Sequence, residues 1–173
     1  MKHATLIASL IALGAFTIQT AEAQRVGRGA GRTASGGVVA GQVHDREGPN
    51  GGTLRGARGV ASDGQGNVIA GSANCADGAA GRACRAGVTE RTADGAVTHE
   101  SGIKIDGANG GTLASQGGFA KDADGNVVRD RTTEASNQNG SVAVDSAYTS
   151  ETGGSRTVTC ANAAGEIVTC PTR

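Results

Sequence analysis

Turn glycines recur along this chain about every 15 residues, and this regular spacing constrains the fold more than any other feature. Two turn patterns alternate, Gly-x-Val and Asn-Gly, so the full repeat is about 30 residues long. Glycine after asparagine or aspartate accepts the positive φ that tight hairpins require, so the repeat predicts strands joined by turns. The glycines assigned to these turns are Gly36, Gly51, Gly66, Gly81, Gly95, Gly110, Gly125, Gly140 and Gly154.

The segments between the turns alternate in polarity, as in the stretch that contains Val142, Val144 and Tyr148. We therefore predict an all-β fold, an up-and-down antiparallel meander of about eight to ten short strands. A β-solenoid with one coil per repeat of about 30 residues is the alternative. The Arg129-Asp130-Arg131 segment favours the meander, because a solenoid would bury one face of this strand and an unpaired buried arginine costs several kcal/mol.

The composition predicts a thin sheet with little hydrophobic core. The chain contains 30 glycines, one tyrosine, two phenylalanines and no tryptophan. Its formal net charge is zero and most of its apolar residues are β-branched and regularly spaced, which argues against a disordered chain. A sheet of this kind has exposed edges, so we expect self-association through them.

The first 23 residues have the features of an export signal. Lys2 and His3 precede an apolar run, and Ala21-Glu22-Ala23 fits the small-x-small cleavage rule. We expect cleavage after Ala23, a secreted or periplasmic mature protein, and no transmembrane segment after removal of the signal. Residues 24–35 are predicted to be a flexible Gly/Arg-rich leader, and residues 36–173 the β-repeat domain.

Four cysteines in an exported chain predict two disulfides. Their spacing favours the local pairs Cys75–Cys84 and Cys160–Cys170, because each pair brackets a turn nearly symmetrically. The alternative, a four-cysteine metal site, usually requires CxxC pairs, which this chain lacks.

The residues that could carry chemistry are few, and we predict no catalytic, cofactor-binding or metal-binding residue. His44 and His99 each adjoin a carboxylate in sequence, which in a strand sends the two side chains to opposite faces. Asp122 and Asp124 resemble the start of a calcium loop, but the glycine is fourth rather than sixth and the twelfth residue is Thr133. A hairpin turn explains this segment.

The leader carries Arg25, Arg28 and Arg32, which could contact an acidic polysaccharide through weak, salt-sensitive attraction. Phe119 and Tyr148 are the only phenylalanine and tyrosine after the signal, so no aromatic platform for base stacking is expected and we predict no nucleic-acid partner.

Mid-strand glycines have a different expected role from turn glycines. We expect valine at Gly56 or Gly117 to be tolerated, because valine suits a pleated surface.

The unit DADGNVV (residues 122–128) and the segment TVTCANAAGEIVTC (residues 157–170) resemble uncharacterised Gly/Ala/Ser-rich repeat proteins exported by Gram-negative bacteria. The first unit is also similar to the YD repeats of Rhs-type shells, without their tyrosine. The repeat of about 30 residues resembles that of curli-type amyloid subunits, without their Gln/Asn ladders in register. These resemblances imply export and a structural role, and they transfer no catalytic residue.

The sequence thus predicts an exported structural or interaction repeat protein of the cell surface or extracellular matrix, capable of self-assembly, and not an enzyme. The alternative is a monomeric secreted or periplasmic module that binds an ion or an acidic glycan.

Overall fold

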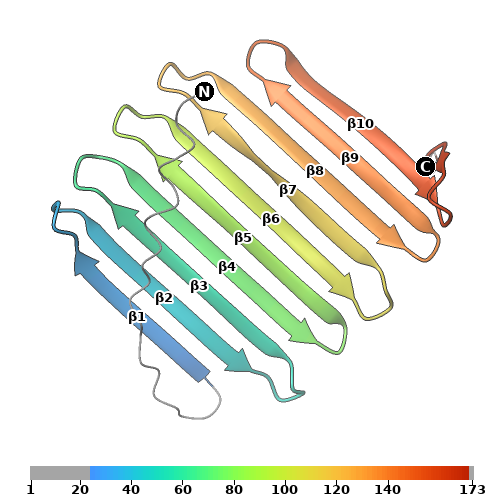
Figure 1. Cartoon of the computed structure of the whole chain (residues 1–173), viewed down its shortest axis with the longest axis horizontal. Helices are drawn as coiled ribbons and strands as arrows, with labels where there is room; N and C mark the ends of the chain where they lie inside the picture. Colours follow the sequence, from blue (N-terminus) through green and yellow to red (C-terminus); the bar gives the residue numbers. More distant parts are fainter. Residues whose placement is uncertain (1–23, 172–173) are drawn as a thin grey trace.

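The computed structural model describes residues 24–171, so the predicted signal, residues 1–23, lies outside the described residues. The described chain forms one open antiparallel sheet of 11 strands, in which each strand pairs with its neighbours in sequence (Figure 1). The strands are β1 (Gln24–Arg32), β2 (Val38–Glu47), β3 (Thr53–Ser62), β4 (Val68–Gly78), β5 (Gly81–Arg91), β6 (Val97–Gly107), β7 (Thr112–Lys121), β8 (Val127–Asn137), β9 (Gly140–Thr149), β10 (Gly153–Asn162) and β11 (Ile167–Val168).

The predicted meander is confirmed, and the solenoid alternative is wrong. All pairings are antiparallel between consecutive strands, whereas a solenoid would stack successive coils. The strands begin 13 to 16 residues apart, which matches the glycine spacing. No helix long and apolar enough to cross a membrane occurs within residues 24–171.

The flexible leader predicted for residues 24–35 is wrong, because most of it forms β1. This strand pairs with β2 along its whole length, from Gln24 opposite Arg46 to Arg32 opposite Val38. Backbone groups make the ladder hydrogen bonds, so a Gly/Arg-rich segment without an apolar period can still add a strand to an existing edge. The sheet therefore starts at Gln24 rather than at residue 36.

Most of the turns share one geometry. In the β7–β8 connection the N–H of Asp122 donates to the carbonyl of Asn126 at 3.1 Å, and the N–H of Gly125 donates back to Asp122 at 3.2 Å. The glycine is the fourth of five residues and takes a positive φ of 94°. This is the arrangement of a hairpin loop that ends with a left-handed residue. Glycine is favoured there because it has no Cβ to clash in that conformation.

The structure gives positive φ to the predicted turn glycines with one exception. Gly154 lies inside β10 opposite Tyr148, and the neighbouring Gly153 takes the positive φ of 77°. Gly64 and Gly165, which fall outside the regular spacing of about 15 residues, have positive φ as well.

The sheet is a single layer, with no second sheet or helix against it among the described residues (Figure 1). Cys160, 8% exposed, is the only buried apolar residue in this part of the chain. Large aliphatic side chains such as Val128 and Val158 remain half exposed. Stability must therefore come mainly from ladder hydrogen bonds and cross-strand side-chain contacts, rather than from a core.

The expected tolerance of valine at mid-strand glycines is also wrong. A Cβ added to Gly117 would lie 2.6 Å from the Cα of Arg131 and even closer to the Asp130 carbonyl oxygen. A Cβ on Gly56 would meet the side chain of His44, 2.7 Å from its Nε2. Gly117 needs glycine because the backbone of β8 occupies the space of a side chain, whereas at Gly56 the side chain of His44 would have to move.

Candidate functional site

The residues that could have carried catalysis do not form a site. His44 and Asp45 lie on opposite faces of β2, since successive residues of a strand alternate between the two faces. His99 on β6 stacks against Phe119 at a centroid distance of 5.8 Å, and its Nδ1 lies 2.8 Å from the hydroxyl of Thr89. Within residues 24–171, no three His, Cys, Asp or Glu side chains group closely enough to hold a metal ion.

The calcium-like segment is a hairpin turn stabilised by its own aspartate. The backbone N–H and the side-chain amide of Asn126 both donate to the carboxylate of Asp122 at 2.8 Å. These hydrogen bonds favour the charged form and hold the pKa of Asp122 below its usual value. Asp63 has the same relation to Asn67 in the β3–β4 turn, and its pKa is lowered for the same reason.

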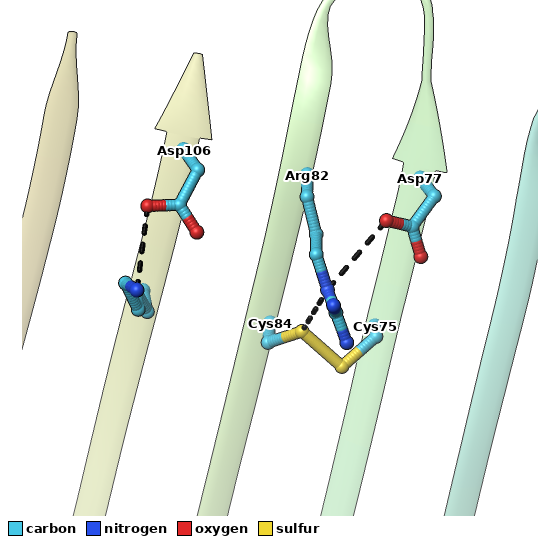
Figure 2. Close-up of polar contacts among 6 residues, drawn as sticks. Cys75, Asp77, Arg82, Cys84 and Asp106 are labelled. Carbon is cyan, nitrogen blue, oxygen red and sulfur yellow. Dashed lines mark hydrogen bonds and ion pairs between the residues drawn. A yellow bond between two sulfur atoms is a disulfide. The ribbon is translucent and has the colours of Figure 1, made fainter. Parts of the chain in front are cut away.

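The cysteines pair as the sequence analysis expected, Cys75 with Cys84 and Cys160 with Cys170. Cys75 and Cys84 lie directly opposite each other on β4 and β5. Figure 2 shows the Arg82 side chain extending beside this disulfide, with its Nε 3.5 Å from Asp77 and 3.4 Å from the Cys84 sulfur. Two disulfides indicate an oxidising, extracytoplasmic environment.

The strand register divides the charged side chains between two chemically different faces. Residues directly opposite each other on paired strands point to the same side of a sheet, so the pairing can be followed from strand to strand. We call the side that carries the Cys75–Cys84 disulfide the acidic face, and the opposite side the basic face.

The acidic face carries nine strand carboxylates and four cations. The carboxylates are Asp45, Glu47, Asp77, Glu90, Glu100, Asp106, Asp130, Glu134 and Asp145. The cations are Arg25, Arg55, Arg82 and Lys104.

Among the described strands, the basic face carries ten cations and no carboxylate. The cations are Arg28, Arg32, Arg46, Arg58, Arg85, Arg91, Lys121, Arg129, Arg131 and Arg156. Phe119 and Tyr148 lie on this face too, each opposite Arg129 on the strand between them. A chain with no net charge has therefore separated its charges across one sheet.

Ion pairs occur on the acidic face. Arg55 contacts Asp45 at 3.4 Å, Arg82 contacts Asp77 at 3.5 Å, and Lys104 contacts Asp106 at 3.5 Å (the last two pairs are drawn in Figure 2). Three of its four cations are thus neutralised by carboxylates on the same face, which leaves that face negative.

Two arginines on the basic face, Arg58 and Arg131, have neutral hydrogen-bond partners. Arg58 donates to Gln42 at 2.9 Å, and Arg131 donates to Ser115 at 3.0 Å and Ser101 at 3.3 Å. Arg131 reaches Ser101 across β7, where Gly117 lies opposite both residues and leaves room for the side chain. Hydrogen bonds to amides and hydroxyls orient these guanidinium groups without cancelling their charge.

A shallow hollow of about 760 Å³ opens on the basic face over the N-terminal half of the sheet. Small residues on β1, β2, β4 and β5 line it, among them Ala30, Ala40 and Ala70. Arg28 and Arg58 also line it. The hollow combines positive charge with an uncrowded surface.

Charges on both sides of β8 are evident from the sequence, but their separation over the whole sheet is not. The arginines of residues 24–35 were expected in a flexible leader, whereas Arg28 and Arg32 belong to the basic face. The sequence does contain a signal for this charge separation. Whether an odd or an even number of residues separates each arginine from its turn glycine determines the face on which the arginine lies.

Comparison with known protein families, curated proteins and solved structures finds no match for this chain. The geometry therefore defines the class alone: a single-layer all-β repeat protein with two disulfides and two oppositely charged faces.

Proposed function

We propose that this chain is an exported, non-catalytic structural or interaction repeat protein of the cell surface or extracellular matrix, and that it self-associates. The observation that carries the proposal is the single-layer sheet, which leaves both of its faces and most of its apolar side chains accessible. Sheets normally bury at least one face against another layer. Association with further copies would provide that layer.

The edges of the sheet support the same proposal. β1 has no partner on its outer side among the described strands, and β11 covers only Cys160 and Ala161 of β10. Free strand edges present unpaired N–H and C=O groups to other chains. The disulfides support export, because they persist in oxidising compartments.

The test is the size of the purified, oxidised protein in solution. Light scattering after size exclusion should give a mass many times that of one chain, and negative-stain electron microscopy should show extended particles. A monodisperse monomer at high micromolar concentration would contradict self-association.

The hollow on the basic face supports a second candidate, a monomeric module that binds an acidic glycan. Titration with heparin as a sulfated probe, followed by calorimetry, tests it. Binding that is lost in Arg28→Ala and Arg58→Ala variants of a monomeric protein would favour the module. The absence of binding would exclude it.

A further inference from the structure

The two faces of this sheet are complementary to each other. One carries nine strand carboxylates, and three of its four cations are already paired there. The other carries ten strand cations, and Arg58 and Arg131 are oriented by neutral groups. The acidic face of a second copy therefore has the charge that complements the basic face.

The shape of the sheet favours the same partner. In Figure 1 the strands stay nearly aligned from β1 to β10. Sheets of many strands usually twist, and those that remain flat are typically stabilised by stacking on other sheets. Strands of about ten residues, spaced by roughly 4.8 Å, give each face an area of about 1,500 Å². This exceeds the roughly 800 Å² per partner of an ordinary stable interface.

The acidic face is also open to close approach. Gly29, Gly41, Gly59 and Gly71 lie opposite one another on β1 to β4 and form a row without side chains. On the basic face the same part of the sheet carries the hollow, which is lined by Arg28, Arg58 and small residues such as Ala40. The row of glycines on one face and the hollow on the other both leave room for a second sheet to approach.

We propose that copies of this chain stack face to face, the acidic face of one copy against the basic face of the next. Contact between two basic faces would bring twenty cations together without strand carboxylates, and contact between two acidic faces would be repulsive as well. Contact between unlike faces is heterologous and leaves one free face at each end of the stack, so it can continue without closing. The inference rests on the proposed self-association and adds the surface through which it occurs.

Charge-reversal variants of exposed residues test the inference. One variant makes the acidic face positive, and the other makes the basic face negative. The first carries Glu100→Lys, Asp130→Lys and Glu134→Lys; the second carries Arg91→Glu, Arg129→Glu and Arg156→Glu. A turn variant, Asp124→Lys with Glu151→Lys, changes charge away from both faces and serves as the control. Far-UV circular dichroism verifies that each variant folds.

Each single-face variant should need at least a tenfold higher concentration than the wild type to assemble, as measured by light scattering. An equimolar mixture of the two should assemble again, because the positive face of one meets the negative face of the other. The turn variant should behave as the wild type does.

Three results would overturn the inference. If the wild type assembles and neither single-face variant weakens assembly, copies associate through strand edges, and the proposed function stands without face stacking. If both variants fail but their mixture does not recover, the contact is not between unlike faces. If the wild type stays monomeric, with or without added heparin, the proposed self-association fails together with the stacking.

Discussion

Adding one methyl group at Gly117 should strongly destabilise the sheet. This glycine lies in the middle of β7, opposite Ser101 on one side and Arg131 on the other. A Cβ there would lie 2.6 Å from the Cα of Arg131. Non-bonded carbon atoms prefer about 3.5–4.0 Å, so β7 and β8 must separate locally by about 1 Å.

The cost of this separation has two parts. Overpacking in a well-fitted structure typically costs about 1–3 kcal/mol. Moving β8 also strains the ladder and the bonds from Arg131 to Ser115 and Ser101, and a typical hydrogen bond contributes about 0.5–1.5 kcal/mol net. We therefore expect Gly117→Ala to lower the free energy of unfolding by about 2–4 kcal/mol.

Gly41→Ala is the matched control. It is also a mid-strand glycine, but its added Cβ would lie at an ordinary 3.5 Å from the Arg58 carbonyl oxygen. Alanine at a compatible position stabilises by about 0.4–1 kcal/mol, because it restricts the unfolded chain. Urea unfolding of both variants, followed by circular dichroism at a concentration below assembly, gives the comparison. Equal free energies of unfolding for the two variants would refute the close approach of β7 and β8.

Three further predictions concern the turns and the disulfides. Gly110→Val should lower the free energy of unfolding by about 1–2 kcal/mol, since φ is 77° and only the backbone conformation, not a clash, opposes the side chain; an unchanged urea midpoint would contradict the turn. Replacing Cys75 and Cys84 by serine should cost about 2–3 kcal/mol by loop entropy, measured in the same way; no loss would mean that the hairpin is fixed without the bond. The lowered pKa of Asp122 stabilises the fold fully above its ordinary value of 3.8, and this contribution is lost as the pH falls through the lowered folded-state value. Thermal melts from pH 6 to 2 should show a smaller acid-induced decrease in Asp122→Asn, and identical pH profiles would contradict the assignment.

The elements that could be predicted from the sequence are those determined by residues close together in the chain. A glycine after aspartate or asparagine marks a left-handed turn position, and Val142, Val144 and Tyr148 alternate as a strand should, so β9 and its neighbours could be placed. The Cys75–Cys84 pairing followed from near-symmetric placement about a turn. Both inferences use spacing within a single hairpin.

The features that could not be predicted from the sequence depend on pairing between strands of different hairpins. β1 lacks an apolar period, and only the free edge of β2 makes it a strand. Gly117 resembled any strand glycine until β8 was placed beside it. The separation of charge needed the register of all ten long strands, because a shift of one residue in any turn would move a whole strand's side chains to the other face.

The charge separation has a cost for the isolated sheet, and this cost gives a final test. Opposite charges facing each other across strands are favourable, and the acidic face uses such pairs at Asp45–Arg55 and Asp77–Arg82. On the basic face, no carboxylate of the described strands faces a cation in this way. Repulsion among its cations therefore opposes folding of a single copy, while attraction to a neighbouring acidic face favours a stack. At 1 M salt the Debye length is only about 3 Å, so the stronger screening weakens both the repulsion and the attraction. Raising sodium chloride from 0.05 to 1 M should thus increase the urea midpoint of dilute protein and decrease the mass of the assembled protein. Changes of the same sign in both measurements would show that charge separation does not drive the association.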